Sequence, residues 1–273
     1  MGTFERDTQL FDMHCHLSFV DDAQAVRACL RESGVRALSC TVTPAEYEQG
    51  LEAFAGVPAC TVALGLHPWQ VADGACGTGD DELKLERAMK RFEELAPSTR
   101  FIGEIGLDYR GTRGEAPSRQ LQQAYFDLIL QACEAVSRFP RKLISLHASS
   151  NVTSDVLDML ERRCNMPARH DCIFHWFQGT SEDLKRAREL GCYFSMGPRM
   201  LATKRGAEYA RIVPLDRLLL ETDSPAHPGD AWSCEAWLSA LAGALDTIAE
   251  IRSESEDKIA RVIAETSERL LRG

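Results

Sequence analysis

Short apolar runs alternate with longer amphipathic segments from one end of the chain to the other. This alternation constrains the fold more than any other feature, because parallel strands need crossover connections, which are usually helices. Eight of the apolar runs have the length and residue types of strands. They are 9–14, 35–41, 59–65, 101–104, 143–147, 172–175, 193–196 and 218–222. The pattern therefore predicts an α/β fold built on a parallel sheet.

The segments between these strands have apolar residues at three- and four-residue spacing, as amphipathic helices do. We expect helices at 22–33, 81–94, 119–138, 153–164 and 182–190, and two closing helices within 236–271. Loops are expected at 73–80 and 110–117. Eight strands with intervening helices predict a (β/α)8 TIM barrel, with residues 1–273 as a single domain. The alternative, an open doubly wound sheet, lacks its GxGxxG loop after the first strand.

Composition narrows the class of protein. The formal net charge of -10 argues against binding nucleic acid mainly through clustered lysines and arginines. A phosphate substrate stays open, because bound dications supply positive charge locally. No apolar stretch approaches the roughly 20 residues of a membrane span. The 10 cysteines are scattered without a CxxC pair, so we expect reduced thiols in a cytoplasmic protein, and a monomer by default.

Metal-competent side chains stand at the ends of several expected strands. His14 and His16 are two residues apart at the first strand end, so they face the same side. The others end the fourth, fifth and sixth strands and follow the eighth: Glu104, His147, His175 and Asp223. Each alone has a structural explanation, such as an acid that caps the next helix. Because barrel enzymes place catalytic groups at this rim, repetition at five strand ends predicts one metal site.

The residue types indicate the ions and the chemistry. Imidazole with carboxylate suits Zn²⁺ or Mn²⁺, and carboxylates with water also admit Mg²⁺. Six ligands exceed the three or four that one catalytic cation usually takes. We therefore expect two divalent ions with Glu104 between them. Asp223 is expected to orient the attacking water and to accept its proton.

Several motifs resemble those of the TatD family of metal-dependent hydrolases, over nearly the whole chain. They lie at 12–17, 65–68, 103–109, 175–179, 193–197 and 214–225. The resemblance implies a TIM barrel with two divalent metals that hydrolyses phosphodiesters, as a DNase or 3′ to 5′ exonuclease. By position it implies His14, His16 and Asp223 for the first metal, His147 and His175 for the second, and Glu104 as the bridge. His67 matches a family position near the substrate, although Gly-Leu-His-Pro also fits a turn.

Two departures from the family pattern bear on the substrate. Ser149 stands where the family usually has an arginine, which removes a bidentate oxyanion contact. Residues 226–234 also differ from the usual sequence after the eighth strand. The expected function is hydrolysis of nucleic acid or another phosphodiester by metal-activated water. The first alternative is hydrolysis of an amide, lactone or carboxylic ester, and the second is a metal-binding accessory protein without turnover.

Other side chains are candidates for substrate contacts. Those that follow the fourth and seventh strands are either phosphate contacts or solvated loop charges: Arg110, Arg113, Arg199 and Lys204. Trp176 and Tyr109 either stack on a base or pack against the barrel rim.

Overall fold

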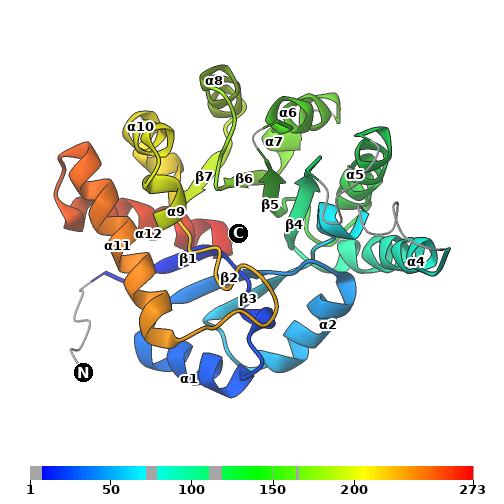
Figure 1. Ribbon diagram of the computed structural model, residues 1–273, viewed down its shortest axis with the longest axis horizontal. Coiled ribbons are helices and arrows are strands. Elements are labelled where there is room, and N and C mark those ends of the chain that lie inside the picture. Colours follow the sequence, from blue (N-terminus) through cyan, green and yellow to red (C-terminus); the bar gives the residue numbers. More distant parts are fainter. Residues whose placement is uncertain (1–7, 72–78, 111–118, 150, 164–165, 273) are drawn as a thin grey trace. The chain divides into compact units, whose positions relative to one another are not determined.

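The computed structural model describes residues 8–71, 79–110, 119–149, 151–163 and 166–272. The expected loops at 73–80 and 110–117 lie mostly outside these ranges, as does Arg113. Strands and helices alternate along the described chain (Figure 1). The residues divide into two compact units. The first unit comprises Met1–Ser39, Leu51–Thr61 and Phe194–Gly273, and the second comprises Cys40–Gly50 and Val62–Tyr193.

All eight expected strands are present, with ends shifted by a few residues. They are β1 (Phe11–Cys15), β2 (Arg36–Cys40), β3 (Cys60–Ala63), β4 (Phe101–Leu107), β5 (Leu143–Ala148), β6 (Asp171–His175), β7 (Tyr193–Met196) and β8 (Leu218–Leu220). β8 ends before 222, because the backbone N–H of Thr222 donates to the Asp12 side chain at 3.1 Å and not to the backbone of a neighbouring strand. β4 runs past its expected end at 104.

The longer helices include every expected one. They are α1 (Ala23–Ser33), α2 (Pro44–Ala53), α4 (Gly79–Leu95), α5 (Arg119–Glu134), α6 (Thr153–Arg162), α8 (Ser181–Glu189), α10 (Lys204–Ile212), α11 (Cys234–Arg252) and α12 (Glu256–Arg272). Short turns of helix are η1 (Leu17–Phe19), η2 (Ala96–Ser98), α7 (Met166–Arg169), α9 (Pro198–Leu201) and η3 (Leu215–Arg217). The expectation that α5 reaches 138 is wrong. Ser137 instead donates its hydroxyl to the Pro97 carbonyl at 2.7 Å, and Pro140 disfavours helix just beyond.

In the first unit, β1 pairs in parallel with β2, and β7 pairs in parallel with β8. The register of β1 shifts between Asp12 and Cys15, next to His14. α1 begins at the cap Asp22, whose carboxylate accepts from Ala25 N–H at 3.0 Å, and ends at Gly34 in the left-handed region. The local start and stop signals of this helix were therefore readable from the sequence.

A disulfide between Cys29 of α1 and Cys234 of α11 corrects the expectation that all cysteines are reduced. The two residues are 205 positions apart, so local spacing gives no sign that they meet. Their Cα atoms lie 5.7 Å apart, within the usual range for a bridge. Six further cysteines are free thiols: Cys15, Cys40, Cys60, Cys133, Cys172 and Cys192. Cys76 and Cys164 lie outside the described residues.

In the second unit, β4 pairs in parallel with β5, and β5 with β6. The register of β4 shifts between Ile102 and Ile105, where Gly103 and Gly106 have φ values of 155° and 151°. A Cβ at Gly106 would lie 1.9 Å from the His147 carbonyl oxygen, so only glycine fits there. This irregular stretch contains Glu104, whose N–H donates to the Thr41 carbonyl at 2.9 Å.

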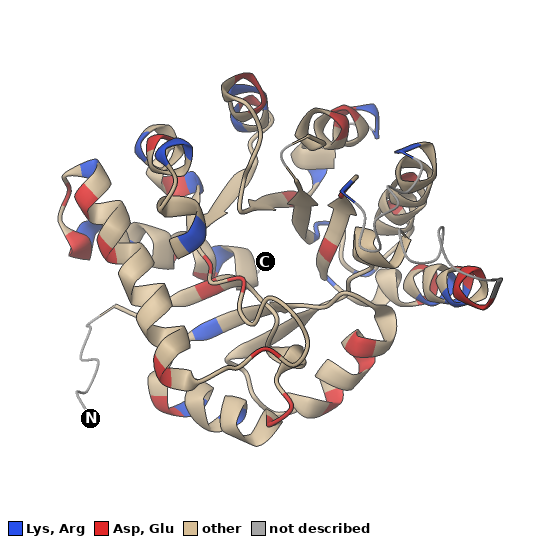
Figure 2. Ribbon diagram, viewed as in Figure 1, with Lys and Arg blue, Asp and Glu red and all other residues tan. Residues whose placement is uncertain are grey.

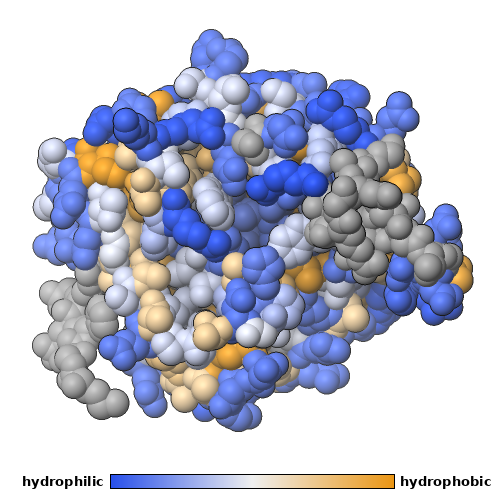
Figure 3. Space-filling view, in the orientation of Figure 1, coloured by the Kyte–Doolittle hydropathy of each residue, from blue (hydrophilic) through white to orange (hydrophobic). Residues whose placement is uncertain are grey.

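The surface carries both signs of charge. Figure 2 shows acidic and basic residues interspersed along the helices. On the face seen in Figure 3, hydrophilic residues predominate and hydrophobic ones form small separate patches. Within the described ranges, no helix has the length and apolar character needed to cross a bilayer.

Candidate metal centre

Four of the predicted residues meet around one carboxylate oxygen in the second unit. Glu104, which is 2% exposed, places its Oε1 atom 2.5 Å from His147 Nδ1 and 2.7 Å from His175 Nε2. The same oxygen lies 3.4 Å from Nε2 of His67. Glu104 lies in the middle of β4, whereas His147 and His175 lie at or next to the carboxyl ends of β5 and β6. The structure thus brings these residues together within this unit, although Glu104 does not end its strand as expected, because β4 continues to Leu107.

The spacing of the donor atoms fits a divalent cation. His147 Nδ1 lies 3.2 Å from His175 Nε2, and both nitrogens also approach Glu104. Two ring nitrogens cannot both point a hydrogen at each other over this distance, so at least one presents a lone pair. A carboxylate with lone-pair-bearing imidazoles is a ligand set for borderline divalent ions. The donor chemistry therefore suits a metal ion held by Glu104, His147 and His175.

His67 differs from the other two histidines in the role its ring can take. The backbone N–H of Trp69 donates to Nδ1 of His67 at 3.1 Å, so that atom keeps its lone pair. In the neutral ring, Nε2 then carries the hydrogen. That hydrogen is directed toward Glu104 and His147, at 3.4 and 3.3 Å. Although His67, Glu104 and His147 are grouped closely enough to hold an ion, this tautomer favours His67 as a hydrogen-bond donor.

Asp108 is a site residue that the strand-end pattern in the sequence does not identify. Its Oδ2 lies 3.4 Å from Nε2 of His147, the ring nitrogen opposite Glu104. Ser149 donates its hydroxyl to Oδ1 of Asp108 at 3.1 Å, and Arg110 donates to the same atom at 3.1 Å. Carboxylates in this position fix the orientation of metal-ligating imidazoles. The signal was present as an acid four residues after Glu104 in the same motif.

The electrostatics of this cluster favour positive charge. Burial disfavours the charged ring, but Glu104 and Asp108 together raise the pKa of His147 to about 9. Burial likewise disfavours the charged carboxylate of Asp108, yet hydrogen bonds from His147 and Arg110 lower its pKa well below its usual range. Carboxylates that stabilise a proton on the imidazole also attract a cation, which replaces that proton when it binds.

The other three predicted ligands lie together in the first unit. His16 Nε2 is 3.3 Å and His14 Nε2 is 3.8 Å from Oδ1 of Asp223. Both histidines are almost fully buried. The backbone N–H of Asp223 donates to the His14 carbonyl at 2.9 Å, and His16 N–H donates to the Ser224 carbonyl at 3.1 Å. These two backbone bonds position the end of β1 beside the residues that follow β8.

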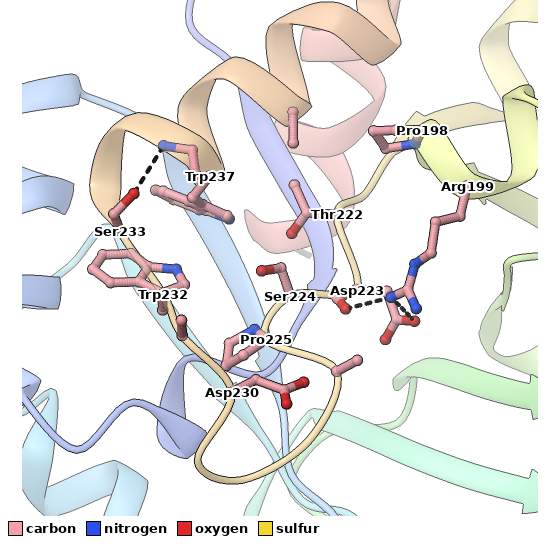
Figure 4. A pocket seen from close by; sticks show the side chains of 14 residues that line it. Pro198, Arg199, Thr222, Asp223, Ser224, Pro225, Asp230, Trp232, Ser233 and Trp237 are labelled. Carbon is pink, nitrogen blue, oxygen red and sulfur yellow. Dashed lines mark hydrogen bonds and ion pairs between the residues drawn. The ribbon is translucent and has the colours of Figure 1, made fainter.

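Asp223 has an unusual backbone and a basic neighbour. Its φ of 52° lies in the left-handed region, which costs a residue other than glycine on the order of 1 kcal/mol. Arg199 donates from Nη2 to Oδ2 of Asp223 at 2.8 Å and to its carbonyl at 2.9 Å, as Figure 4 shows. This bond leaves Oδ1 directed to the two histidines. Arg199 thus contacts the site, whereas Lys204 begins α10.

Asp12 is buried, and its hydrogen bonds hold together the segments that carry these ligands. Its Oδ2 accepts hydrogen bonds from the Thr222 hydroxyl at 2.6 Å and from Trp237 Nε1 at 2.7 Å. Burial raises the pKa of Asp12 to about 6, against the lowering effect of these bonds. Asp12 therefore ties β1 to the end of β8 and to α11, a role that its place in the 12–17 motif does not reveal.

Tyr109 lies in packing contacts. Its ring is 7% exposed, its hydroxyl donates to Asp155 at 2.7 Å, and the Arg119 guanidinium lies 4.5 Å from the ring centroid. Of the two interpretations given for Tyr109, this favours packing at the rim over stacking on a base.

Solved structures with the same fold place the chain in a class. It superposes with a TatD family hydrolase from Entamoeba histolytica at a TM-score of 0.70, with 14% identity, covering 96% of this chain and 98% of that one. The TM-score with an uncharacterized amidohydrolase from Saccharomyces cerevisiae is 0.71, with 17% identity and coverage of 96% and 99%. The fold is thus that of the α/β TIM-barrel proteins.

The chain belongs to the TatD related DNase family, whose model matches residues 11–272. A Schizosaccharomyces pombe protein named deoxyribonuclease Tat-D is 28% identical over 217 residues, which are 78% of this chain and 66% of that protein. An uncharacterized metal-dependent hydrolase of Escherichia coli is 27% identical over 265 residues, 93% and 95% of the two chains. A Pantoea vagans protein named 3′-5′ ssDNA/RNA exonuclease TatD is 26% identical over 224 residues, 79% of each.

Proposed function

We propose that this protein hydrolyses phosphodiester bonds of DNA in a divalent-metal-dependent reaction, as an exonuclease that works from the 3′ end. The observation that carries the proposal is the approach of His147 and His175 to one oxygen of Glu104, at 2.5 and 2.7 Å. Family membership and the names of the relatives support the nuclease assignment, because those relatives are named deoxyribonucleases or exonucleases.

We propose further that the two ligand groups serve one centre with two ions. His14, His16 and Asp223 would hold the first ion, His147 and His175 the second, and Glu104 would bridge them. Support comes from the class of fold, since TIM-barrel enzymes build their sites from the carboxyl ends of several strands. Mg²⁺, Mn²⁺ and Zn²⁺ all tolerate this mixture of imidazole and carboxylate. When bound, such ions lower the pKa of water and neutralise charge on a phosphoryl group.

The chain's own residues would manage the proton and the substrate. Asp223 Oδ1 accepts one proton from the attacking water while the water oxygen bonds to phosphorus and the phosphorus–oxygen bond to the leaving group breaks. The leaving oxygen takes a proton from solvent. Arg199 holds the other carboxylate oxygen of Asp223 at 2.8 Å, so the accepting oxygen stays aimed at the histidines. His67 can donate its Nε2 hydrogen to a substrate phosphate.

Ser149 favours a second candidate, hydrolysis of an amide, lactone or carboxylic ester. Its hydroxyl bonds to Asp108 at 3.1 Å, where the usual family arginine would offer a bidentate contact to an oxyanion. A carbonyl substrate has less charge to neutralise than a phosphodiester, so the absence of the arginine would matter less for its hydrolysis. A metal-binding accessory role without turnover is the remaining alternative.

One experiment separates these functions. Purified protein is loaded with Mg²⁺, Mn²⁺ or Zn²⁺, its metal content is measured, and each form is incubated with 5′-labelled single-stranded DNA and with a panel of amides, lactones and esters. Nucleotides released stepwise from the 3′ end support the proposal. Cleavage confined to the carbonyl panel overturns it in favour of the second candidate, and bound metal without turnover of either favours the accessory role.

We also propose that the chain acts as one domain, as a monomer and in the cytoplasm. A single family model that spans 11–272 supports the first point. Light scattering after size exclusion tests the second. Disulfides are rare in the cytosol, so the Cys29–Cys234 bridge makes the third point directly testable. Thiol alkylation of the protein in intact cells, followed by mass spectrometry, would contradict it if the bridge is fully oxidised there.

A further inference from the structure

A cavity of about 330 Å³ lies beside Asp223 in the first unit (Figure 4). The segment between β8 and α11 and the first turns of α11 form most of its wall, and Arg199 of α9 contributes one side. This segment, 226–234, is the one whose sequence departs from the usual family pattern. Asp223 and Arg199 have roles proposed above, and Thr222 and Trp237 hold Asp12, but Trp232 and Asp230, which also line the cavity, have none. The cavity therefore needs its own explanation.

The back wall of the cavity is rigid and aromatic. Trp237 is 2% exposed, and its Nε1 donates to Asp12 at 2.7 Å, so its indole has one fixed orientation. The ring of Trp232 lies 6.3 Å from that of Trp237, with an interplanar angle of 42°. The Cys29–Cys234 disulfide anchors the chain two residues beyond Trp232. A planar ligand that enters here meets a preformed aromatic surface.

Trp232 also presents a buried donor. Its Nε1 atom is shielded from solvent and finds no acceptor among the residues that the structure describes. In Figure 4 this nitrogen lies on the edge of the ring that faces Ser224 and Pro225. A buried N–H without a partner is unfavourable, and an acceptor on a ligand would remove that cost. This geometry therefore favours a ligand with a hydrogen-bond acceptor on its edge.

A carboxylate of the protein also lines the cavity. This residue, Asp230, receives the backbone N–H of His227 on Oδ2 at 3.0 Å. A carboxylate has further lone pairs and accepts from amino or imino groups. Nucleobases combine a flat ring with acceptors and N–H donors on one edge. At about 330 Å³ the cavity lies at the small end of ligand pockets, which suits one base.

We propose that this cavity binds the base of the nucleotide next to the scissile bond, with Trp232 stacking on it or donating to it and Asp230 accepting from its edge. The inference rests on the proposed function, because Asp223 borders the cavity and would act on the adjoining phosphate. The base site would give the protein a preference for DNA 3′ ends that carry a base over abasic DNA ends with the same backbone.

The test compares two single-stranded DNA 10-mers that differ only at the 3′ end, one with thymidine and one with an abasic tetrahydrofuran residue. The readout is the ratio of kcat/KM values for release of the terminal unit in one protein. Removal of a stacking aromatic typically costs about 5- to 150-fold per base. We expect a ratio in that range for the unmodified protein, a ratio near one for Trp232→Ala, and an intermediate ratio for Trp232→Phe, which keeps a ring without the N–H.

Glu235→Ala is the matched control, because Glu235 lies three residues further along, is exposed and does not line the cavity. It should keep the ratio of the unmodified protein. A ratio near one in the unmodified protein, or an unchanged ratio in Trp232→Ala, overturns the inference.

A binding measurement separates this inference from the proposed function. Calorimetry in Mn²⁺ compares thymidine 5′-monophosphate with deoxyribose 5-phosphate. If no DNA is cleaved but the nucleotide binds at least about fivefold more tightly, and Trp232→Ala abolishes the difference, the base site stands while the proposed function fails. Equal affinity for the two compounds overturns the base site, whether or not DNA is cleaved.

Discussion

Asp108 Oδ2 lies 3.4 Å from His147 Nε2, on the opposite side of the imidazole from Glu104. The ring is therefore held between two carboxylates. Glu104 reaches Nδ1, the nitrogen that would bind metal, and Asp108 reaches Nε2. Replacing partners of this kind typically weakens metal binding about 10- to 100-fold. We expect that loss in Asp108→Asn, measured as the dissociation constant for Mn²⁺ by calorimetry. Asp127→Asn, which alters only an exposed pair with Arg163, should bind like the unmodified protein. Equal affinities of all three proteins would exclude the positioning role.

Asp223→Asn should abolish most activity while it preserves the backbone. Asparagine tolerates the left-handed region, so a φ of 52° stays accessible to it. The amide oxygen still accepts from Arg199, but the side chain no longer takes a proton from water. Loss of a general base lowers kcat by about 10²- to 10⁴-fold. The check is kcat on single-stranded DNA, beside a thermal melt that shows the fold intact. A folded variant with undiminished kcat would remove Asp223 from the chemistry.

His170 should make the protein less stable as the pH falls below neutrality. It is 2% exposed, and its Nδ1 accepts the backbone N–H of Lys142 at 3.2 Å. Burial, together with the positive charges of Arg169, Lys142 and Arg141, lowers the pKa of His170 to about 4. The unfolded chain, with a pKa near 6.5, then binds more protons than the native state between those values.

The contribution of His170 to the free energy of unfolding should therefore be fully present above about pH 6.5. The free energy of unfolding should fall by up to about 3 kcal/mol as the pH approaches 4. His170→Asn keeps an acceptor for the Lys142 N–H but does not titrate, so this part of the pH dependence should disappear. Urea unfolding of both proteins at pH 7 and pH 4.5 measures the difference. Parallel pH profiles for the two proteins would contradict the assignment to His170.

Reduction of the Cys29–Cys234 bridge should destabilise the fold. A cross-link between residues 205 positions apart removes much of the entropy of the unfolded chain. The chain-entropy model gives about 5 kcal/mol for a loop of this length, and measured losses are commonly about 2 to 5 kcal/mol. We expect such a decrease in the free energy of unfolding for Cys29→Ala with Cys234→Ala. Cys60→Ala, which removes a free thiol, serves as the control. An unchanged value in the double variant would mean that the bridge does not form in solution.

Much of the fold could be predicted from local signals. Helix caps such as Asp22 and Gly34 act within a few residues, so α1 was placed to within one residue at each end. Strand positions followed from apolar runs for the same reason. α5 was expected to be four residues longer than it is, because its end depends on the bond from Ser137 to Pro97, a contact between distant segments.

The sequence by itself determined which residues are candidate metal ligands, because a side chain's type and its place in or after an apolar run are both local properties. It thereby indicated Glu104, His147 and His175 before any distance was known. Only the tertiary structure decided that Asp108 backs His147, that Cys29 meets Cys234 and that Trp232 lines a cavity beside Asp223. These relationships join segments with no local spacing between them, and their geometry follows from how the helices and strands pack.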